Sequence, residues 1–368
     1  MTSSLLPEGL RDRLPPQADA AAAILRAALD AIRAHGYERV APPLAEYEES
    51  LVGRLKAGAA RDLLRVADPL SQRTLALRPD ITTQVGRIAA TRLAHRPRPL
   101  RLSYGGPVVK LRATQLRPER EMTQIGAELI GRDTAPACAE IVALAVEALA
   151  AAGATGITVD LTLPNLVDTL AAGPLPLGPR EAAQVRALLD AKDAGGLAAF
   201  GATAYLPLAE AAGPFAEAIA RLRAFDATGA LASRIAALEA IAARLEGIAR
   251  VTLDPAERHG FEYQSWLGFS LFADGLTGEV GRGGSYAILH EEGREEPAVG
   301  FSIYPDPLLD TRADEQPPRR LFLPLGHDPA AANRLRAEGW ITVAALDRDC
   351  APAGCTHVLE GKEATRIG

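Results

Sequence analysis

The segment RLSYGGPVVKLRATQLRPEREMTQIGAELIG, from Arg101 to Gly131, constrains the fold more than any other part of the chain. It predicts a strand, a charged loop and a return strand. On the return strand Gln124 and Glu128 share one face, because side chains of an extended chain repeat every two residues. Such a pair is suited to a ligand that carries an ammonium group and a ring nitrogen. A solvated sheet face gives the same alternation, so the pattern alone leaves both interpretations open.

The upstream segment LALRPDITTQVGR, residues 75–87, favours the ligand site. Taken with the hairpin, it resembles the catalytic domain of the histidyl-tRNA synthetase family, a class II aminoacyl-tRNA synthetase fold. The resemblance places Gln124 and Glu128 on histidine-contacting positions of that family. Asp80 and Thr82 fall on two more, with Asp80 as a shorter form of the usual glutamate.

The ATP-binding motifs of that family are altered in this chain. The second motif requires an arginine that clamps the α-phosphate and the substrate carboxylate, since only a planar guanidinium gives bidentate contacts. Lys110 stands in its place, and two positions later Arg112 replaces an acidic residue. The arginine of the third motif is replaced by Pro307, which has neither a charge nor an N–H donor. We therefore expect that adenylation has been lost.

The histidine-specific segment of the family is altered as well. RHGFEYQSWLGFSLF occupies the place of the Arg-Gly-Leu-Asp-Tyr-Tyr run, with His259 for the arginine and Gln264 for the second tyrosine. The glycine pair at 283–284 is retained, but Ser285 follows it in place of arginine. Part of the amino-acid pocket therefore remains, either as a histidine site or only as structure.

A synthetase-like chain without ATP chemistry, and with a short C-terminal part, is similar to the regulatory subunits of ATP phosphoribosyltransferase, the first enzyme of histidine biosynthesis. The similarity spans residues 5 to about 310. It implies a non-catalytic chain that binds the short-form catalytic subunit, raises its activity and mediates feedback inhibition by histidine. It also implies a dimer built through the family's first motif, here YERVAPPLAEYEES.

The resemblance also implies a role for each site residue. Glu128 and Asp80 neutralise the α-ammonium of histidine, Thr82 lies alongside, Gln124 hydrogen-bonds near the carboxylate or ring, and Lys110 takes the carboxylate. The full predicted histidine site consists of Asp80, Thr82, Lys110, Gln124, Glu128, His259 and Gln264. No residue is assigned a catalytic role and no cofactor is expected, because no Walker sequence, phosphoribosyl pyrophosphate loop, GxSxG elbow or HExxH helix is present.

Other function classes stay open at this point. The chain is a ligand-free structural dimer partner if the altered pocket binds nothing. A diverged enzyme that activates an amino acid for a carrier or small molecule, or a working histidyl-tRNA synthetase, conflicts with Lys110 and Pro307.

Composition restricts the partners and the compartment. The chain has 368 residues, 48% hydrophobic and 23% charged, which is typical of a soluble globular protein of two or three domains. A net charge of −6 without a basic run argues against a nucleic-acid partner. No signal peptide is visible and no stretch of about 18 apolar residues runs unbroken. We expect a cytoplasmic protein with no membrane partner.

The three cysteines, Cys138, Cys350 and Cys355, are too few for a disulfide framework. Cys350 and Cys355 lie near His357, but their spacing is not that of a usual zinc knuckle and a fourth ligand is missing. We therefore expect no metal site.

The predicted fold class is α+β, with an antiparallel sheet flanked by helices as in class II synthetases. The synthetase-like domain covers residues 1–310, with an inserted alanine-rich helical subdomain at about 179–250. Antiparallel strands resume at Val251 and continue to Ile303. A proline-rich linker then leads to a small α/β domain at residues 319–368 that begins with a strand, a helix and a strand.

Several local features are also predicted. Helical spacing of apolar residues predicts a helix from Ala18 to Ala34, ended by Gly36. Asn165 and Asp328 are predicted helix caps, although Asp328 also stands where a helix N-terminus can bind an anion. The arginine-rich segment from Arg92 to Arg101 is predicted to be a solvated connector because of its prolines.

Overall fold

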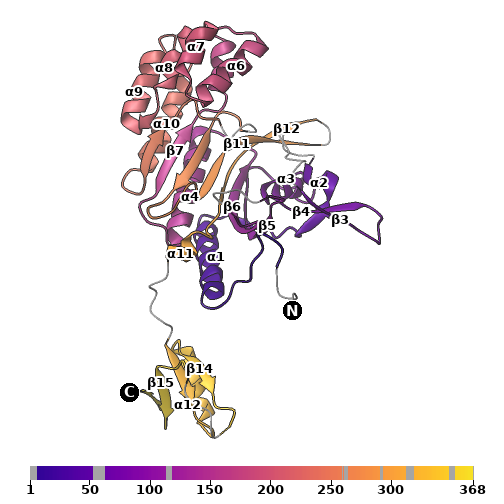
Figure 1. The fold of residues 1–368 in the computed structure, drawn as a ribbon, viewed down its shortest axis with the longest axis vertical. Coiled ribbons are helices and arrows are strands. Elements are labelled where there is room, and N and C mark those ends of the chain that lie inside the picture. Colours follow the sequence, from indigo (N-terminus) through magenta and orange to yellow (C-terminus); the bar gives the residue numbers. More distant parts are fainter. Residues whose placement is uncertain are drawn as a thin grey trace. The chain divides into compact units, whose positions relative to one another are not determined.

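The computed structural model describes residues 6–52, 63–112, 118–258, 260, 264–290, 293–311, 319–347 and 353–367. It divides into two compact units, Met1–Thr311 and Arg312–Gly368 (Figure 1). Within the described ranges, every helix is too short or too polar to span a lipid bilayer. The same residues contain no cluster of three histidine, cysteine or acidic side chains arranged to hold a metal ion.

A nine-stranded sheet forms the centre of the first unit. Its strands lie in the order β1 (Glu38–Arg39), β5 (Leu100–Val109), β6 (Glu121–Ile130), β12 (Glu295–Ile303), β11 (Gly281–Leu289), β10 (Gly268–Phe272), β7 (Thr158–Thr162), β9 (Arg250–Leu253) and β8 (Gly213–Pro214). The predicted sheet of mainly antiparallel strands is confirmed. The prediction is wrong for β9, which pairs in parallel with β7, because a helical crossover joins these two strands.

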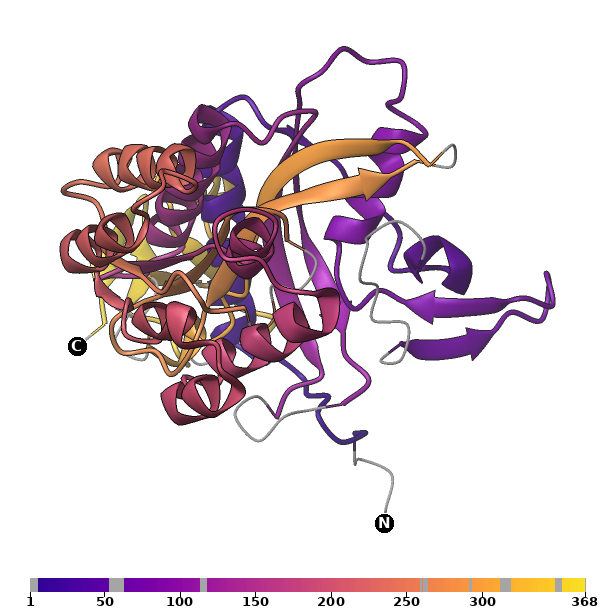
Figure 2. The ribbon, with the colours of Figure 1, turned by 90° about the horizontal axis from the view of Figure 1, so that it is seen from above.

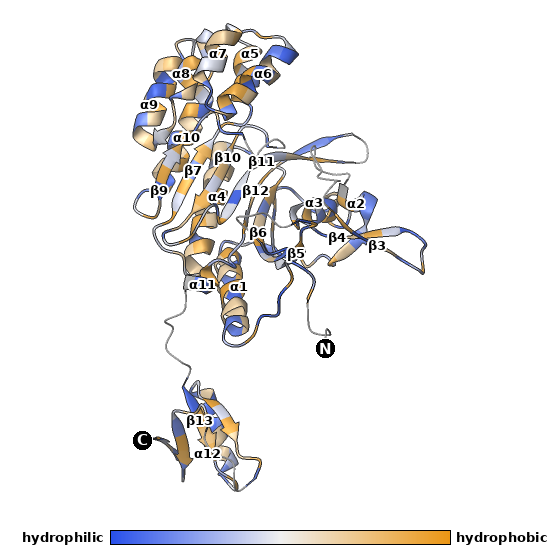
Figure 3. Cartoon of the chain, in the orientation of Figure 1, coloured by the Kyte–Doolittle hydropathy of each residue, from blue (hydrophilic) through white to orange (hydrophobic). Residues whose placement is uncertain are grey.

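Two long helices cover one face of the sheet. They are α1 (Gln17–Ala34), confirmed within one residue, and α4 (Ala135–Ala151). Gly36 follows α1 with a φ of 81°, a left-handed conformation that glycine adopts without strain. Ile32 and Ile141 are fully buried in the largest core cluster. Strand β7 and helix α4 are correspondingly orange in Figure 3.

Shorter helices connect β7 with β9. They are α5 (Leu166–Ala171), α6 (Pro179–Asp190), α7 (Ala194–Phe200), α8 (Leu206–Ala209), α9 (Phe215–Phe225) and α10 (Ala232–Arg244), with a 3₁₀ turn at Thr203–Tyr205. Asn165 precedes α5, but its side chain makes no capping hydrogen bond and its Oδ1 is buried without a partner. The predicted cap is therefore wrong at Asn165.

A small sheet and two helices lie near the end of the main sheet that is opposite to the helices between β7 and β9 (Figure 1). The sheet has the order β2 (Ala45–Tyr47), β4 (Thr74–Leu77) and β3 (Leu64–Ala67), and the helices are α2 (Glu48–Val52) and α3 (Thr82–Ala90). Val85 and Ala89 of α3 pack with Tyr104 and Tyr286 on the second face of the main sheet. In Figure 2 the purple β3–β4 hairpin extends away from the pink helices between β7 and β9.

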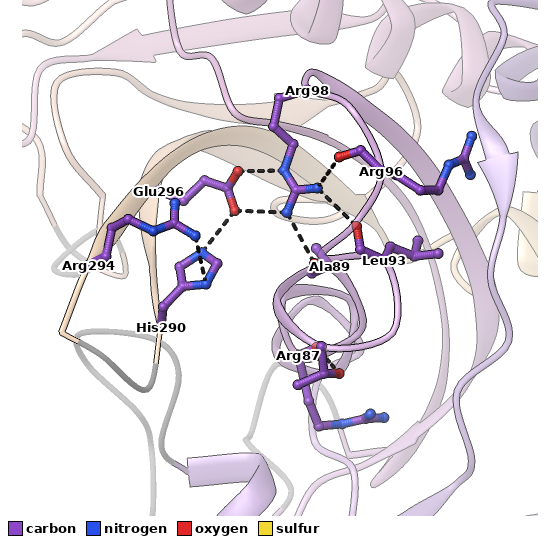
Figure 4. A network of polar contacts seen from close by, with 9 residues as sticks. Arg87, Ala89, Leu93, Arg96, Arg98, His290, Arg294 and Glu296 are labelled. Atoms are coloured by element: carbon purple, nitrogen blue, oxygen red, sulfur yellow. Dashed lines mark hydrogen bonds and ion pairs between the residues drawn. The ribbon is translucent and has the colours of Figure 1, made fainter.

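The segment from Arg92 to Arg101 is not simply a solvated connector, because Arg98 is held in place by several partners. Its Nε donates to Glu296 Oε1 at 2.6 Å, and its Nη atoms donate to three backbone carbonyl oxygens of residues 89–96 (Figure 4). His290 Nε2 lies 2.9 Å from the second oxygen of Glu296. Burial alone would raise the pKa of Glu296, but the hydrogen bonds from Arg98 and His290 hold this pKa below its usual value.

The described residues of the second unit form a four-stranded sheet and one helix. The strands lie in the order β14 (Ile341–Ala344), β13 (Arg320–Leu323), β15 (His357–Glu360) and β16 (Glu363–Arg366), and the helix is α12 (Pro329–Ala337). The predicted strand, helix and strand are confirmed as β13, α12 and β14, and the hairpin of β15 and β16 was not predicted. Asp328 Oδ1 accepts from the backbone N of Ala330 at 2.8 Å, so the predicted cap of α12 is also confirmed.

Candidate ligand site

Strand β6 separates two environments. Ile125, Ala127 and Leu129 join the core under α1 and α4, whereas Met122 and Ile130 join the cluster that contains α3. The intervening residues Gln124 and Glu128 therefore point to the α3 side, where they are 0% and 1% exposed. The predicted shared face is present, and it is buried rather than solvated.

Glu128 lies between two tyrosines, Tyr104 on β5 and Tyr286 on β11. Tyr104 OH donates to Oε1 at 3.0 Å and Tyr286 OH donates to Oε2 at 2.7 Å. Burial raises the pKa of Glu128 to about 8; the nearby charge of Asp80 adds to this effect, and the hydroxyl groups oppose it. Tyr104 OH also lies 3.0 Å from Thr82 Oγ1. Glu128 therefore favours its neutral form at neutral pH and gains from a cationic partner.

Gln124 ties the start of α3 to the sheet. Its Oε1 accepts from the backbone N of Ile81 at 2.8 Å, and its Nε2 donates to Asp80 Oδ2 at 2.9 Å and to Ser302 Oγ at 2.7 Å. The backbone N of Thr82 donates to the other oxygen of Asp80 at 2.6 Å. Both ends of the Gln124 amide are thus used to position Asp80 and Thr82 beside Glu128.

A row of glycines lies beside Glu128 on the same face. Glu128 pairs with Gly300 on β12, which pairs with Gly284 on β11. A Cβ atom on Gly300 would overlap Glu128 Oε2, and a Cβ atom on Gly284 would overlap Gln264 Oε1. The two oxygens therefore lie over adjacent glycines. Opposed Cα atoms in antiparallel strands are about 5 Å apart, so the separation of these oxygens is of the same order.

Gln264 has an unused acceptor at this place. Its Nε2 donates to the backbone O of Gly283 at 2.8 Å, whereas its buried Oε1 has no hydrogen-bond partner among the residues that the structure describes. A buried acceptor without a partner is costly and rare in native proteins. A ligand N–H donor above the glycines would satisfy it.

One predicted site residue, Lys110, is not part of this group in the structure. Lys110 is exposed just beyond the end of β5, with its Nζ 5.8 Å from the centre of the Tyr304 ring. Its backbone N pairs with Arg120 O, four residues before Gln124, so about 13 Å of strand separates Lys110 from Gln124. His259 lies outside the described residues.

An ion pair lies at the position of the family's third motif. Arg13 Nη2 is 2.8 Å from Asp306 Oδ2, and the same oxygen accepts from the backbone N of Thr123 at 2.8 Å. Asp306 immediately precedes Pro307. A pocket of about 270 Å³ opens beside this ion pair, lined by Arg11, Asp12, Arg13, Pro107, Glu121, Met122 and Thr123. The N-terminal segment therefore supplies the guanidinium next to Pro307.

Three residues of the site were not identified from the sequence as site residues: Tyr104, Tyr286 and Ser302. They come from β5, β11 and β12, and only strand register brings them to β6. One signal was available for Tyr104, because Gly126 lies between Gln124 and Glu128 on their face. Tyr104 pairs with Gly126, and a Cβ atom there would overlap the tyrosine hydroxyl.

Comparisons with known proteins show which proteins this chain is similar to. The family model described as histidyl-tRNA synthetase matches residues 9–308. The ATP phosphoribosyltransferase regulatory subunit of Rhodospirillum centenum is 44% identical over 97% of this chain and 95% of its own length. That of Paramagnetospirillum magneticum is 43% identical over 97% of this chain and 96% of its own length.

Solved structures give the same fold. An ATP phosphoribosyltransferase regulatory subunit/histidyl-tRNA synthetase from Bacillus halodurans has a TM-score of 0.80 and 25% identity, covering 98% of both chains. Histidyl-tRNA synthetase from Nostoc has a TM-score of 0.76 at 15% identity, covering 96% of this chain and 90% of its own, which supports the fold alone. This chain therefore belongs to the family of ATP phosphoribosyltransferase regulatory subunits, non-catalytic chains with the class II fold of histidyl-tRNA synthetase.

Proposed function

We propose that this chain binds the short-form catalytic subunit of ATP phosphoribosyltransferase in the cytoplasm, raises its activity and conveys feedback inhibition by histidine. One observation carries the histidine part of the proposal: the buried carboxyl of Glu128 and the unpartnered Oε1 of Gln264 lie over adjacent glycines. Both are acceptors, so they favour a ligand with more than one N–H donor.

Histidine has the donors that these acceptors need. Its α-ammonium is a cation, which the carboxylates of Glu128 and Asp80 neutralise, and its ring offers an N–H group to Gln264 Oε1. Thr82, hydrogen-bonded to Tyr104, lies alongside. Because burial raises the pKa of Glu128 to about 8, binding of the ammonium displaces a proton from this carboxyl at neutral pH.

Feedback requires that histidine bind one state of the complex more tightly than another, with a coupling of about 1–3 kcal/mol in typical allosteric proteins. The position of Asp80, Ile81 and Thr82, which lead directly into α3, supports this part of the proposal. A ligand that pulls on Asp80 therefore acts on the start of a helix that packs on the main sheet.

We also propose that the chain forms a dimer through the small sheet. The register of β2, β4 and β3 places Tyr47, Leu75 and Val66 in one row on the same face. Val66 is 50% exposed. Burial of such an apolar face against a second copy is favourable. Sedimentation velocity of Val66→Lys, compared with wild type, is expected to show monomer in place of dimer.

The regulatory role is tested by mixing the purified chain with a short-form catalytic subunit and measuring its turnover with and without histidine. Activation, and inhibition by histidine that Glu128→Ala abolishes, are the expected results. Glu147→Ala is the matched control, because Glu147 is an exposed glutamate on α4 that pairs with His35. Turnover that does not change when this chain is added, together with no co-elution, would overturn the regulatory role.

Isothermal titration of histidine into the chain alone separates sensing from a ligand-free structural role. A measurable heat that Glu128→Ala removes supports sensing. Activation of the catalytic subunit without any histidine binding would leave the chain as a structural activator only.

A further inference from the structure

Arg282 lies on the ligand side of the sheet and is held by a bidentate ion pair. It is on β11 two residues before Gly284 and pairs with Ser302. Its Nε and Nη2 donate to the two oxygens of Glu279 at 2.7 and 2.8 Å, and Ser270 Oγ donates to Glu279 at 2.7 Å. Two parallel hydrogen bonds fix the plane of a guanidinium as well as its position.

The same guanidinium reaches the segment that carries Gln264. Arg282 Nη1 donates to the backbone O of Gly260 at 3.1 Å. Gly260 has a φ of 79°, and a Cβ atom there would overlap the guanidinium. Glycine is thus needed at 260 both for its backbone conformation and for close approach of the arginine.

The segment is also attached to β11 at its other end. Gln264 Nε2 donates to Gly283 O, and the backbone N of Ser265 donates to Ser285 O at 2.7 Å. Ser285 Oγ accepts from the backbone N atoms of Trp266 and Leu267, each at 3.1 Å. Gly260 and Gln264, the described residues on either side of 261–263, are therefore both held by β11.

We propose that Arg282 is a positioning residue for the ligand, which fixes the backbone of Gly260, four residues before Gln264, so that Gln264 Oε1 stays over the glycines. The inference rests on the proposed histidine site. It follows from the direction of the contacts: Glu279 orients the guanidinium, the guanidinium holds Gly260 O, and Gln264 lies four residues further along the chain.

Histidine affinity of Arg282→Met, measured by isothermal titration, tests this role. We expect the dissociation constant to rise about tenfold or more, as for loss of a charged hydrogen bond. Arg282→Lys, which keeps the charge, is expected to recover part of the affinity. Glu279→Gln is expected to weaken binding less than Arg282→Met, because the bond to Gly260 remains possible.

The matched control is Arg250→Met. Arg250 also pairs with a carboxylate, Asp274, and with a backbone oxygen, that of Gly156, but it lies on β9 away from the loop. Its histidine affinity is expected to stay within about twofold of wild type, the usual result for an exposed site far from the ligand. Equal affinities for Arg282→Met, Arg250→Met and wild type would overturn the positioning role.

A second measurement does not depend on histidine. Trp266 and Trp340 are the two tryptophans of the chain, so Trp340→Phe leaves Trp266 as a single fluorescent reporter next to the loop. In that background Arg282→Met is expected to increase acrylamide quenching of Trp266, and Arg250→Met is not. If the wild-type chain binds no histidine, the proposed histidine sensing fails. The acrylamide quenching of Trp266 in the two variants still tests whether Arg282 positions this part of the chain. Unchanged quenching would refute that role.

Discussion

The two faces of strand β6 differ sharply, although they are built from alternate residues of one segment. One face presents Ile125, Ala127 and Leu129 to the helices α1 and α4, where all three join the largest apolar core cluster. The other presents Gln124 and Glu128, both buried and both fully engaged with polar partners. Apolar side chains of suitable volume are enough to fill the first face. The second face requires hydrogen-bond donors and acceptors at particular positions.

The comparison bears on the proposed ligand site. A buried carboxyl that prefers to be neutral at pH 7 costs stability whenever it is ionised, and an apolar residue of similar size would avoid that cost. The proposed ligand gives Glu128 a role in these surroundings that folding alone does not give it. Variants of each face should separate these two roles.

The largest expected effect is on the apolar face. Ile125→Ala removes a fully buried side chain under α1 and α4, and we expect the free energy of unfolding to fall by about 2–5 kcal/mol. Urea unfolding followed by circular dichroism measures this loss. Histidine affinity of the folded protein should change little, because the side chain points away from the site. A loss below about 1 kcal/mol would contradict the packing described for this face.

Glu128→Gln, on the polar face, should instead stabilise the chain at high pH, so its effect on the free energy of unfolding depends on pH. The folded-state pKa of Glu128 is about 8 and its ordinary value is 4.5, so between these values the folded chain binds more protons than the unfolded chain. Wild-type stability therefore falls as pH rises through this window, whereas the neutral glutamine is unaffected. By about pH 9 the variant should be more stable than wild type by on the order of 3 kcal/mol.

Urea unfolding of both proteins from about pH 5 to about pH 9 measures this difference. Glu147→Gln is the control for removal of a glutamate, because Glu147 is exposed on α4. A stability difference between Glu128→Gln and wild type that does not grow with pH would show that Glu128 titrates normally.

Tyr286→Phe tests the polar contacts around that carboxyl. It removes the hydroxyl that donates to Glu128 Oε2 at 2.7 Å, so the pKa of Glu128 should rise further. We expect a stability loss of about 1 kcal/mol below pH 8 that grows to about 2 kcal/mol once Glu128 is ionised.

Tyr205→Phe provides a matched comparison in the helices between β7 and β9. Tyr205 OH donates to the neutral backbone O of Leu175 at 2.7 Å, so its loss should cost about 1 kcal/mol at every pH. The same pH dependence for both tyrosine variants would argue that the acceptor of Tyr286 is not a titrating carboxyl.

The sequence predicted those parts of the site that lie on one strand. Gln124 and Glu128 were placed on a shared face because the side-chain period of a strand is two residues. Tyr104 and Tyr286 were not identified as site residues, because strand register across β5, β6, β12 and β11 decides which side chains meet, and register is not local information. The family resemblance supplied Asp80 and Thr82, which local pattern would not have joined to β6.

The errors of prediction have the same physical origin. Arg98 follows a proline and precedes another, which is typical of a solvated loop, yet Glu296 from a distant strand pairs with its guanidinium. The parallel pairing of β9 depends on how the inserted helices return the chain. Asp328 was predicted as a cap, and this was confirmed, because a capping contact lies within three residues of the chain.

Lys110→Ala should have the smallest effect, and it decides between the sequence and the structure. The resemblance gives Lys110 the carboxylate of histidine, but the structure places it exposed and about 13 Å along the strands from Gln124. At 0.1 M salt, exposed charges separated by more than about 10 Å are largely screened. Stability should stay within about 0.5 kcal/mol of wild type and the histidine dissociation constant within about twofold.

If titration calorimetry instead shows a tenfold weaker histidine complex, Lys110 reaches the polar face of β6 when ligand binds. The ligand-bound site would then extend further toward the end of the hairpin than the positions of Asp80, Glu128 and Gln264 indicate.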